Sequence, residues 1–232
     1  MYGMGHIGKI EQICTDDKNE RKEYTVHKGK IGSGEPACTI KHPGTVTLET
    51  ERLILRRFVI ADIEPFYRNI ASDPNAFCYL NKSFHKNTYV TKNSIERWIA
   101  DTESPDGYIW CIELKKISEA IGSILITHLD RKFGIARVGY YIGSKFWNRG
   151  YTTEALSAVL AFMFEKVGVI RMEAEYDVEN PASGRVMEKC GMKYERTRKN
   201  GAVNNRGVCD TAVCGMYFSD YELLKNNGAK KN

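Results

Sequence analysis

The sequence predicts a mixed α/β domain built around one central sheet. From Thr45 onward, short segments in which apolar and polar residues alternate are interspersed with segments that have helical spacing. The longest helical segment, at about residues 152–167, carries a single apolar stripe. The clearest alternating segment follows it, with apolar residues at every second position: Ile170, Met172, Ala174 and Tyr176. Helices packed on one sheet follow from these patterns.

The elements are expected in this order: strand 53–58, helix 62–71, helix 94–101, strands 108–114, 121–128 and 138–142, helix 152–167, strand 170–177, helix 180–190, and strands 192–197 and 211–218. Asp62 is expected to act as N-cap of the first helix, and Asp73-Pro74 to end that segment. Gly191 is a natural C′ residue for the helix that ends at residue 190. A loop rich in Gly and Asn, residues 200–207, separates the last two strands.

Residues 1–44 differ from the rest of the chain because they are rich in Gly and Lys and end at His42-Pro-Gly44. Two short patches, Lys9–Cys14 and Tyr24–Lys28, are able to pair as a small β-hairpin. We therefore expect an N-terminal appendage of unknown role at 1–44 and the functional domain at 45–232.

Composition excludes several classes of protein. The net charge of +5 is spread along the 232 residues, whereas nucleic-acid binders concentrate basic residues on one face. No apolar run approaches the ~20 residues of a membrane-spanning helix, and the start lacks signal-peptide features, so we expect a cytoplasmic protein. The seven cysteines lack zinc-like spacing, so we expect reduced thiols and no metal site.

The segment 138–155 has the pattern of an anion site. A strand runs into a short loop, and the loop opens the apolar helix. Such a junction presents free backbone N–H groups and the positive end of a helix dipole, which suit phosphate oxygens. Gly150 allows close backbone approach, and Arg149 adds positive charge. The alternative is an ordinary strand-to-helix turn in which Gly150 supplies a difficult backbone angle.

The stretch Trp147-Asn-Arg-Gly-Tyr-Thr-Thr-Glu-Ala155 resembles the pyrophosphate-binding motif of the GNAT superfamily of N-acetyltransferases, in particular the branch typified by RimJ and RimL. Thr152 replaces a smaller residue of the motif but keeps its amide. The stretch 179–192 resembles the family's second cofactor motif, although Asn180 and Pro181 also fit an ordinary helix start. The stretch 48–56 looks like this branch's usual opening, so the resemblance covers about residues 45–225.

The resemblance implies a GNAT-like fold, in which a mixed, mostly antiparallel central sheet is flanked by helices, and an acetyl-CoA-dependent N-acetyltransferase. Backbone groups of Tyr140, Tyr141 and Ile142 would pair with the pantetheine arm like an added strand. The remaining cofactor contacts implied by the resemblance are Asn148, Arg149, Gly150, Tyr151, Thr152 and Thr153 for the pyrophosphate, and Asn180 and Arg185 for the cofactor wall.

Direct attack of a primary amine in a ternary complex is the expected reaction. An α-amino group, with a pKa of about 8, is neutral far more often at pH 7 than a lysine side chain with a pKa of about 10.4, so it needs less help from a base. A strand amide near Tyr140–Tyr141 is expected to stabilise the oxyanion. The expected acceptor is a protein N-terminus or a small-molecule amine.

The catalytic groups rest on the resemblance. Glu175 lies five residues before Asn180, where some relatives place a catalytic glutamate, and is the first candidate for the base. The alternative is that Glu175 belongs to the solvated face of its strand. Relatives often use a tyrosine acid seven residues after the Asn, but this chain has Met187 there, which leaves Ser183, Tyr140 and Tyr141 as candidates. Arg137 stands where this branch often has Glu.

Acceptor selection is expected to depend on residues 62–101 and on the loop before the last strand. Five aromatic residues of this region either line that pocket or belong to the core: Phe66, Tyr67, Tyr79, Tyr89 and Trp98. The sequence leaves three matters open: monomer or homodimer, the role of residues 1–44, and whether the chain is an enzyme, a catalytically weak acetyl-CoA sensor or an interaction module.

Overall fold

The computed structural model describes residues 40–104 and 107–229. The chain divides into two units, Met1–Pro36 and Ala37–Asn232, and the described residues all belong to the second. The hairpin expected from Lys9–Cys14 and Tyr24–Lys28 lies outside the described residues.

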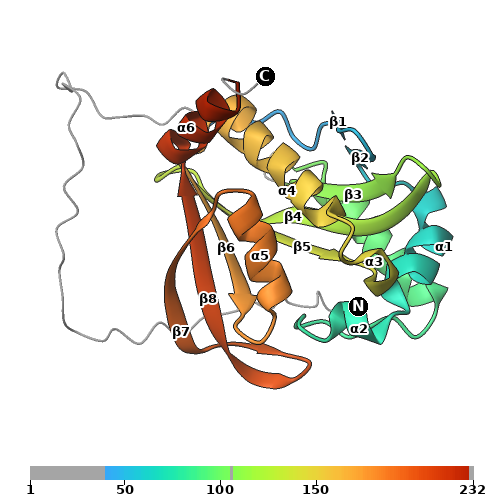
Figure 1. Ribbon diagram of the computed structural model, residues 1–232. Helices are drawn as coiled ribbons and strands as arrows, with labels where there is room; N and C mark the ends of the chain where they lie inside the picture. Colours follow the sequence, from blue (N-terminus) through green and yellow to red (C-terminus); the bar gives the residue numbers. More distant parts are fainter. Residues whose placement is uncertain (1–39, 105–106, 230–232) are drawn as a thin grey trace, which may run out of the picture. The chain divides into compact units, whose positions relative to one another are not determined.

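The described strands form one eight-stranded sheet in the order β1-β2-β3-β4-β5-β6-β8-β7 (Figure 1). Their bounds are β1 Leu48–Glu49, β2 Leu53–Arg56, β3 Ile109–Leu114, β4 Glu119–Asp130, β5 Ile135–Ile142, β6 Arg171–Asp177, β7 Lys193–Asn204 and β8 Gly207–Tyr217. Among the described strands every neighbouring pair is antiparallel except β5 and β6, which are parallel. The expected mixed, mostly antiparallel sheet is confirmed.

The parallel pair β5–β6 is short. Pairing begins at Ile135 with Arg171 and ends at Arg137 with Glu173. Beyond that point β5 stays paired with β4 up to Ile142, while β6 stays paired with β8 up to Asp177. Figure 1 shows the two strands running apart from there. Over residues 138–142, therefore, one edge of β5 has no partner among the described strands.

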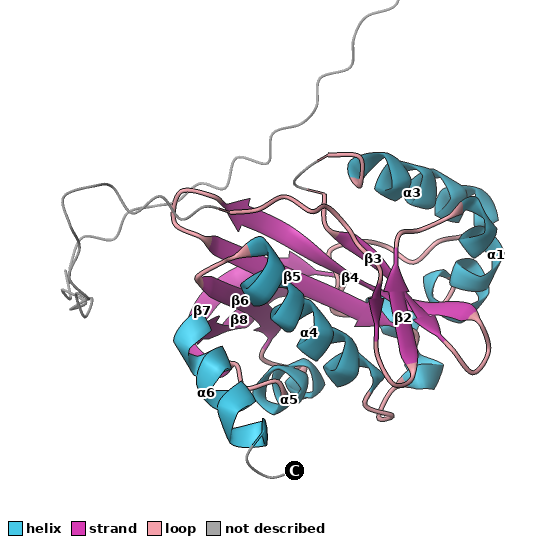
Figure 2. Ribbon diagram, turned by 90° about the horizontal axis from the view of Figure 1, so that it is seen from above, coloured by secondary structure: helices cyan, strands magenta, loops and turns pink. Residues whose placement is uncertain are grey.

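Helices cover both faces of the sheet (Figure 2). Their bounds, with 3-10 and π turns marked η, are η1 Ile60–Asp62, α1 Ile63–Phe66, η2 Tyr67–Ala71, α2 Pro74–Phe77, α3 Thr88–Asp101, η3 Ser144–Phe146, α4 Tyr151–Phe162, η4 Met163–Val167, α5 Pro181–Lys189 and α6 Phe218–Ala229. Strand β3 shows why two layers form. Ile109 and Cys111 join the apolar cluster under α1–α3, while Trp110 and Ile112 join the larger cluster under α4 and α5.

Several expected boundaries are wrong. Asp62 occupies the N-cap position of α1, but its side chain makes no capping bond to that helix. Its carboxylate instead accepts hydrogen bonds from the Val59 N–H and from both terminal nitrogens of Arg56. Helix α3 begins six residues earlier than expected, with Asn87 accepting the Val90 N–H as its cap. Asp73 does not only end a segment, because its side chain also caps the short helix α2.

The C-terminal region also differs from expectation. Strands β7 and β8 extend through most of the expected loop at 200–207 and form a long hairpin. Phe218, expected in the last strand, begins helix α6 instead. Phe218 and Tyr221 pack their rings against Phe164, with centroid separations of 6.0 and 5.2 Å, so aromatic packing holds this helix on the domain.

Candidate active site

The junction between β5 and α4 presents a row of unused backbone donors. Hydrogen bonds of the η3 turn end with the Trp147 N–H, which donates to the Ser144 carbonyl at 3.0 Å. Those of α4 begin with the Glu154 N–H, which donates to the Gly150 carbonyl at 3.0 Å. Within the described part of the chain, amides 148–153 donate to no protein group.

The backbone of this junction needs unusual angles. Asn148 has φ 60° and Gly150 has φ 79°, so two residues close together occupy the left-handed region, which asparagine and glycine tolerate best. Trp147 donates its indole N–H to the Ile142 carbonyl at 3.1 Å and so ties the loop to the end of β5. Arg149 is exposed. The result is a positively polarised array of N–H groups at the start of a twelve-residue helix, which suits a diphosphate.

A second wall of the site comes from α5. Asn180 occupies the N-cap position with Pro181 at N1, as the sequence predicts, but its side chain makes no capping bond to any described residue. The Asn180 amide group is therefore not committed to its own helix. Gly191 has φ 85° and ends the helix as expected. Arg185 is exposed and lines a groove of ≈ 530 Å³ along α5, together with Tyr176 and Tyr194.

Tyr140 links β5 to α5 across the diverging strands. Its hydroxyl donates to the Ser183 carbonyl at 3.1 Å and lies 3.0 Å from the Ser183 hydroxyl. Desolvation raises the pKa of Tyr140 well above its ordinary value, although the bond to Ser183 acts in the opposite direction. The structure thus brings together two residues that sequence reasoning considered separately.

Tyr141 points to the opposite face of the sheet. Its ring packs near Phe66 and Phe77, with centroid separations of 6.3 and 5.8 Å. Desolvation raises the pKa of Tyr141, which keeps the phenol neutral. Tyr141 and Ser183 are therefore not neighbours, since their side chains lie on opposite faces of β5.

Glu175 lies in a network of charges and not on a solvated face. Its carboxylate forms ion pairs with Arg198 and, at 3.4 Å, with Arg137. The side chains of Arg171, Glu173 and Glu175 expose only 9%, 14% and 19% of their surface. The alternative that Glu175 belongs to a solvated face of its strand is therefore wrong, because the side chains on this face are mostly buried. Arg137 forms ion pairs with Glu173 and Glu175 of β6.

A cavity of ≈ 220 Å³ lies at the end of β6. Glu175, Tyr176 and Asp177 form one wall, residues 79–81 form the second, and the β7–β8 hairpin forms the third. Tyr79 therefore lines a cavity, whereas Phe66 and Trp98 belong to the core and pack their rings 5.4 Å apart.

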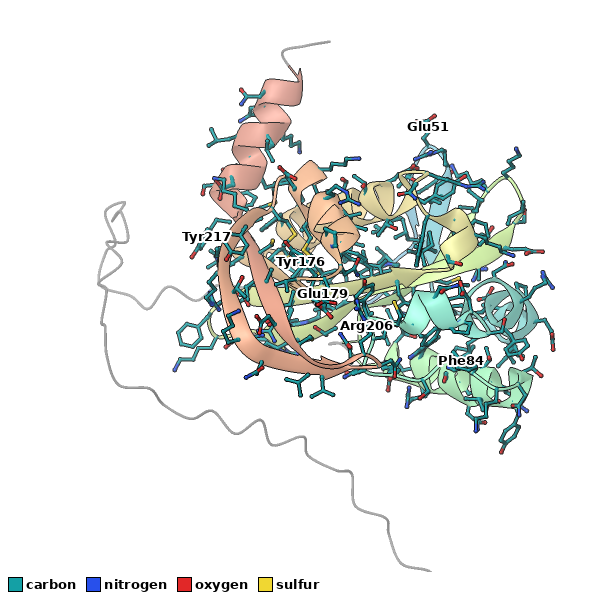
Figure 3. All side chains as sticks on the ribbon, turned by 60° about the horizontal axis from the view of Figure 1, so that its bottom comes forward. Glu51, Phe84, Tyr176, Glu179, Arg206 and Tyr217 are labelled. Carbon is teal, nitrogen blue, oxygen red and sulfur yellow. The ribbon has the colours of Figure 1, made fainter. Side chains whose placement is uncertain are left out.

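The tip of the β7–β8 hairpin is fixed over this cavity. Asn205 donates its backbone N–H to Leu80 at 3.0 Å and its side-chain amide to the Phe77 and Lys82 carbonyls, each at 2.8 Å. Arg206 pairs with Glu179 at 2.6 Å, and Figure 3 shows the two side chains meeting.

The hydroxyl of Tyr79 completes this contact. It accepts from Arg206 at 2.9 Å and donates to the Glu179 carbonyl at 2.9 Å. Sequence reasoning missed Asn205 and Arg206. The turn sequence Asn204-Asn-Arg-Gly207 was the local feature that could have marked this hairpin tip. The residues that Asn205 and Arg206 contact at 77–82 are more than 120 residues away in the chain, so the sequence did not reveal the contact.

Comparison with known proteins decides the family. The family model described as the acetyltransferase (GNAT) domain matches residues 52–193, which is more than half of the chain. The chain belongs to the GNAT acetyltransferase family. It is similar to the uncharacterized N-acetyltransferase YoaA of Bacillus subtilis, with 29% identity over 166 residues that cover 72% of this chain and 93% of YoaA.

Solved structures of GNAT proteins share the fold. The microcin C7 self-immunity acetyltransferase MccE, solved with acetyl-CoA and AMP, aligns with a TM-score of 0.67 and 20% identity, covering 77% of this chain and 98% of MccE. The ribosomal-protein-S5-alanine acetyltransferase of Vibrio fischeri aligns with a TM-score of 0.67 and 18% identity, covering 75% of this chain and 98% of that one. At these identities the likeness concerns the fold.

As a GNAT protein, the chain is an acetyl-CoA-dependent acetyltransferase. The residues present fit that cofactor, because free amides at the start of α4 suit its phosphates and the unpaired edge of β5 suits its amide-containing arm. Over residues 40–104 and 107–229, the structure contains no helix long and apolar enough to cross a membrane.

Proposed function

We propose that this GNAT acetyltransferase transfers the acetyl group of acetyl-CoA to the primary amine of a protein N-terminus or of a small molecule, by direct attack in a ternary complex. The observation that carries the proposal is the row of free amides at 148–153 beside the unpaired edge of β5. Because only the short segment 143–147 separates the edge from the donors in the chain, one extended ligand with a phosphate-bearing end suits both.

The proposed cofactor contacts follow the site from end to end. Amides of Asn148 to Thr153 hold the diphosphate, with the exposed guanidinium of Arg149 adding charge. Backbone groups of Tyr140 to Ile142 pair with the pantetheine arm. Asn180, whose amide is not used as a helix cap, closes the α5 side. Arg185 is proposed for the same wall, where its exposed side chain lines the groove along α5.

The proposed acceptor site is the cavity at the end of β6. Its volume of ≈ 220 Å³ suits one residue of an N-terminus or a small amine better than a long substrate enclosed along its length. Its position at the end of β6, where that strand has diverged from β5, supports an entrance separate from the cofactor's. We also propose membership of the RimJ/RimL-like branch. Its support is the motif at 147–155, the opening at 48–56 and the shared fold of the Vibrio fischeri enzyme.

Glu175 is the proposed base, acting through a water in this cavity. Arg137 and Arg198 hold its carboxylate without using every lone pair, since two carboxylate oxygens offer about four acceptor sites. Bound acetyl-CoA supplies an activated thioester. Ser183 is the proposed proton donor on the other side, with Tyr140 orienting its hydroxyl. Tyr141 is the less favoured candidate because its ring is enclosed by aromatic residues on the opposite face.

A negative charge introduced at position 150 tests whether the diphosphate binds at residues 148–153. Gly150→Asp is expected to weaken coenzyme A binding about tenfold more than Gly150→Asn, because both add similar bulk at a left-handed position but only Asp adds negative charge. Isothermal titration calorimetry measures both affinities. Equal affinities in the two variants would place the phosphates elsewhere.

Acetyl transfer is tested by thiol release with a panel of N-terminal peptides, polyamines, aminoglycosides and amino acids. Release is expected with at least one α-amine, and Glu175→Gln is expected to lower turnover while leaving coenzyme A affinity unchanged. Coenzyme A binding without turnover on any amine would favour the sensor function. An unaltered pH–rate profile in Glu175→Gln would remove this residue from the mechanism.

A further inference from the structure

The turn between β1 and β2 lies against the start of α4, far from it in sequence. Residues Thr50 to Leu53 form this turn, in which the Thr50 N–H donates to the Leu53 carbonyl at 3.0 Å and the Leu53 N–H donates to the Thr50 hydroxyl at 3.0 Å. Glu51 marks its position in Figure 3. Two hydrogen bonds within the turn thus hold Thr50 and Leu53 together beside the start of α4.

Glu154, in the first turn of α4, is the anchor for this contact. The Thr50 hydroxyl donates to one carboxylate oxygen at 2.6 Å, and the Arg52 N–H donates to the same oxygen at 2.8 Å. The Arg52 Nε donates to the other oxygen at 2.7 Å. Three donors thus fix the carboxylate, whose side chain is only 17% exposed.

The Arg52 guanidinium then reaches the proposed diphosphate loop itself. Its Nη1 donates to the Arg149 carbonyl at 2.9 Å. Its Cζ lies 4.7 Å from the centre of the Tyr151 ring. Its Nη2 lies 3.3 Å from the position that a Cβ on Gly150 would occupy. One side chain therefore contacts Arg149 and Tyr151 and lies beside Gly150 between them.

The bond to the Arg149 carbonyl has a direct effect on a donor. In a trans peptide unit the carbonyl of one residue and the N–H of the next point in opposite directions. A hydrogen bond that holds the Arg149 carbonyl toward Arg52 therefore aims the Gly150 N–H away from Arg52. An array of amides binds an anion tightly only when its members are aimed before the anion arrives.

We propose that Arg52 is a positioning residue for acetyl-CoA, which orients the peptide between Arg149 and Gly150 for the diphosphate. This inference rests on the proposed placement of the phosphates at 148–153. Arg52 makes no proposed contact with the reacting atoms, so its effect is on cofactor affinity and not on the chemical step.

The test compares Arg52→Gln with Arg52→Lys and with a control, Arg68→Gln. Arg68 forms an ion pair of 2.8 Å with Glu119, and its side chain is 56% exposed, so the control removes a comparable surface pair away from the loop. Arg52→Gln is expected to weaken coenzyme A binding about tenfold by calorimetry, with the melting temperature as in the control. Arg52→Lys is expected to recover little, because an ammonium group cannot reproduce the fork that spans Glu154 and Arg149.

Two acetyl donors separate positioning from a general structural role. With an amine found in the screen, Arg52→Gln is expected to lose about tenfold in kcat/KM on acetyl-CoA, through KM and not kcat, and almost nothing on S-acetylpantetheine, which lacks the diphosphate. Equal losses on both donors, a melting temperature well below the control, or a coenzyme A affinity within twofold of wild type would overturn the inference.

Gly150→Asp and Gly150→Asn distinguish failure of this inference from failure of the proposed site. If Asp weakens coenzyme A binding more than Asn but Arg52→Gln has no effect, the placement stands and the role of Arg52 is wrong. If Asp and Asn bind equally, the placement itself is wrong.

Discussion

Gly143 lies at the end of β5, directly before the turn that leads into the proposed diphosphate loop, and Gly143→Ala tests how tightly that region is built. Its φ of −57° is ordinary for any residue, so the substitution introduces no backbone strain. The effect is steric. A Cβ at this position would lie 1.9 Å from the backbone oxygen of Asn69, whereas real Cβ atoms essentially never approach within 3.0 Å. The two segments must therefore separate by about 1 Å.

Asn69 cannot move freely. Its side-chain amide donates to Glu119 and to the Ala120 carbonyl, each at 2.9 Å, and its side-chain oxygen accepts from Lys145 at 2.7 Å. Overpacking alone costs about 1–3 kcal/mol, and disturbing one of these bonds costs about 1 kcal/mol more. We expect Gly143→Ala to lower the free energy of unfolding by about 3 kcal/mol. For a chain of this size that corresponds to a fall in Tm of roughly 6–12 °C.

Gly139, in the strand β5 that precedes Gly143, is the matched control. A Cβ there would meet the Thr127 methyl group at 3.2 Å, which a side chain can relieve by a small shift. Thermal denaturation followed by circular dichroism is expected to leave Gly139→Ala within about 1 kcal/mol of wild type. Calorimetry is expected to show weaker coenzyme A binding only in Gly143→Ala. A Tm for Gly143→Ala within about 2 °C of the control would refute the steric reasoning.

Three further outcomes are expected. Burial opposes ionisation of Glu154, but the hydrogen bonds that its carboxylate accepts hold its pKa below the ordinary value of 4.5. The stabilisation that ionised Glu154 gives the fold is therefore present above pH 4.5 and is lost as the pH falls through the folded-state pKa. Tm measured against pH should decline less steeply in acid for Glu154→Gln than for wild type. Asn205→Ala removes two side-chain bonds to the 77–82 segment, so KM for the acceptor should rise severalfold while calorimetry shows unchanged coenzyme A affinity. Tyr140→Phe should lower the free energy of unfolding in urea by about 1 kcal/mol, because it removes the hydroxyl that joins β5 to α5.

Local patterns predicted the elements with strong periodicity. Helix α4 and strand β6 have a clear hydrophobic period of their own, and Gly191 ends α5 because only a residue that tolerates positive φ suits that position. The loop that we propose for the diphosphate was also marked in the sequence, since a glycine between a strand and an apolar helix is a local arrangement.

Features that depend on distant partners were not visible. Asp62 looks like a helix cap in the sequence, yet Arg56 and a backbone amide take its oxygens. Phe218 continues the apolar pattern of β8, yet it begins helix α6, where its ring packs against Phe164. Glu175 has the pattern of an exposed charge on one strand, and only the fold places Arg137 of β5 and Arg198 of β7 beside it.

The short β5–β6 pairing has a mechanical consequence. Among the described residues, β5 and β6 pair through three residue pairs, next to which the Ile170 N–H donates to the Gly134 carbonyl at 2.8 Å. A small rotation of the part of the sheet that ends with β5 against the part that begins with β6 would therefore break few backbone bonds, and the Tyr140–Ser183 contact lies where such a hinge would open. A pantetheine arm bound between the diverging strands β5 and β6 would bridge the two parts of the sheet. Coenzyme binding should therefore reduce the motion of one part relative to the other.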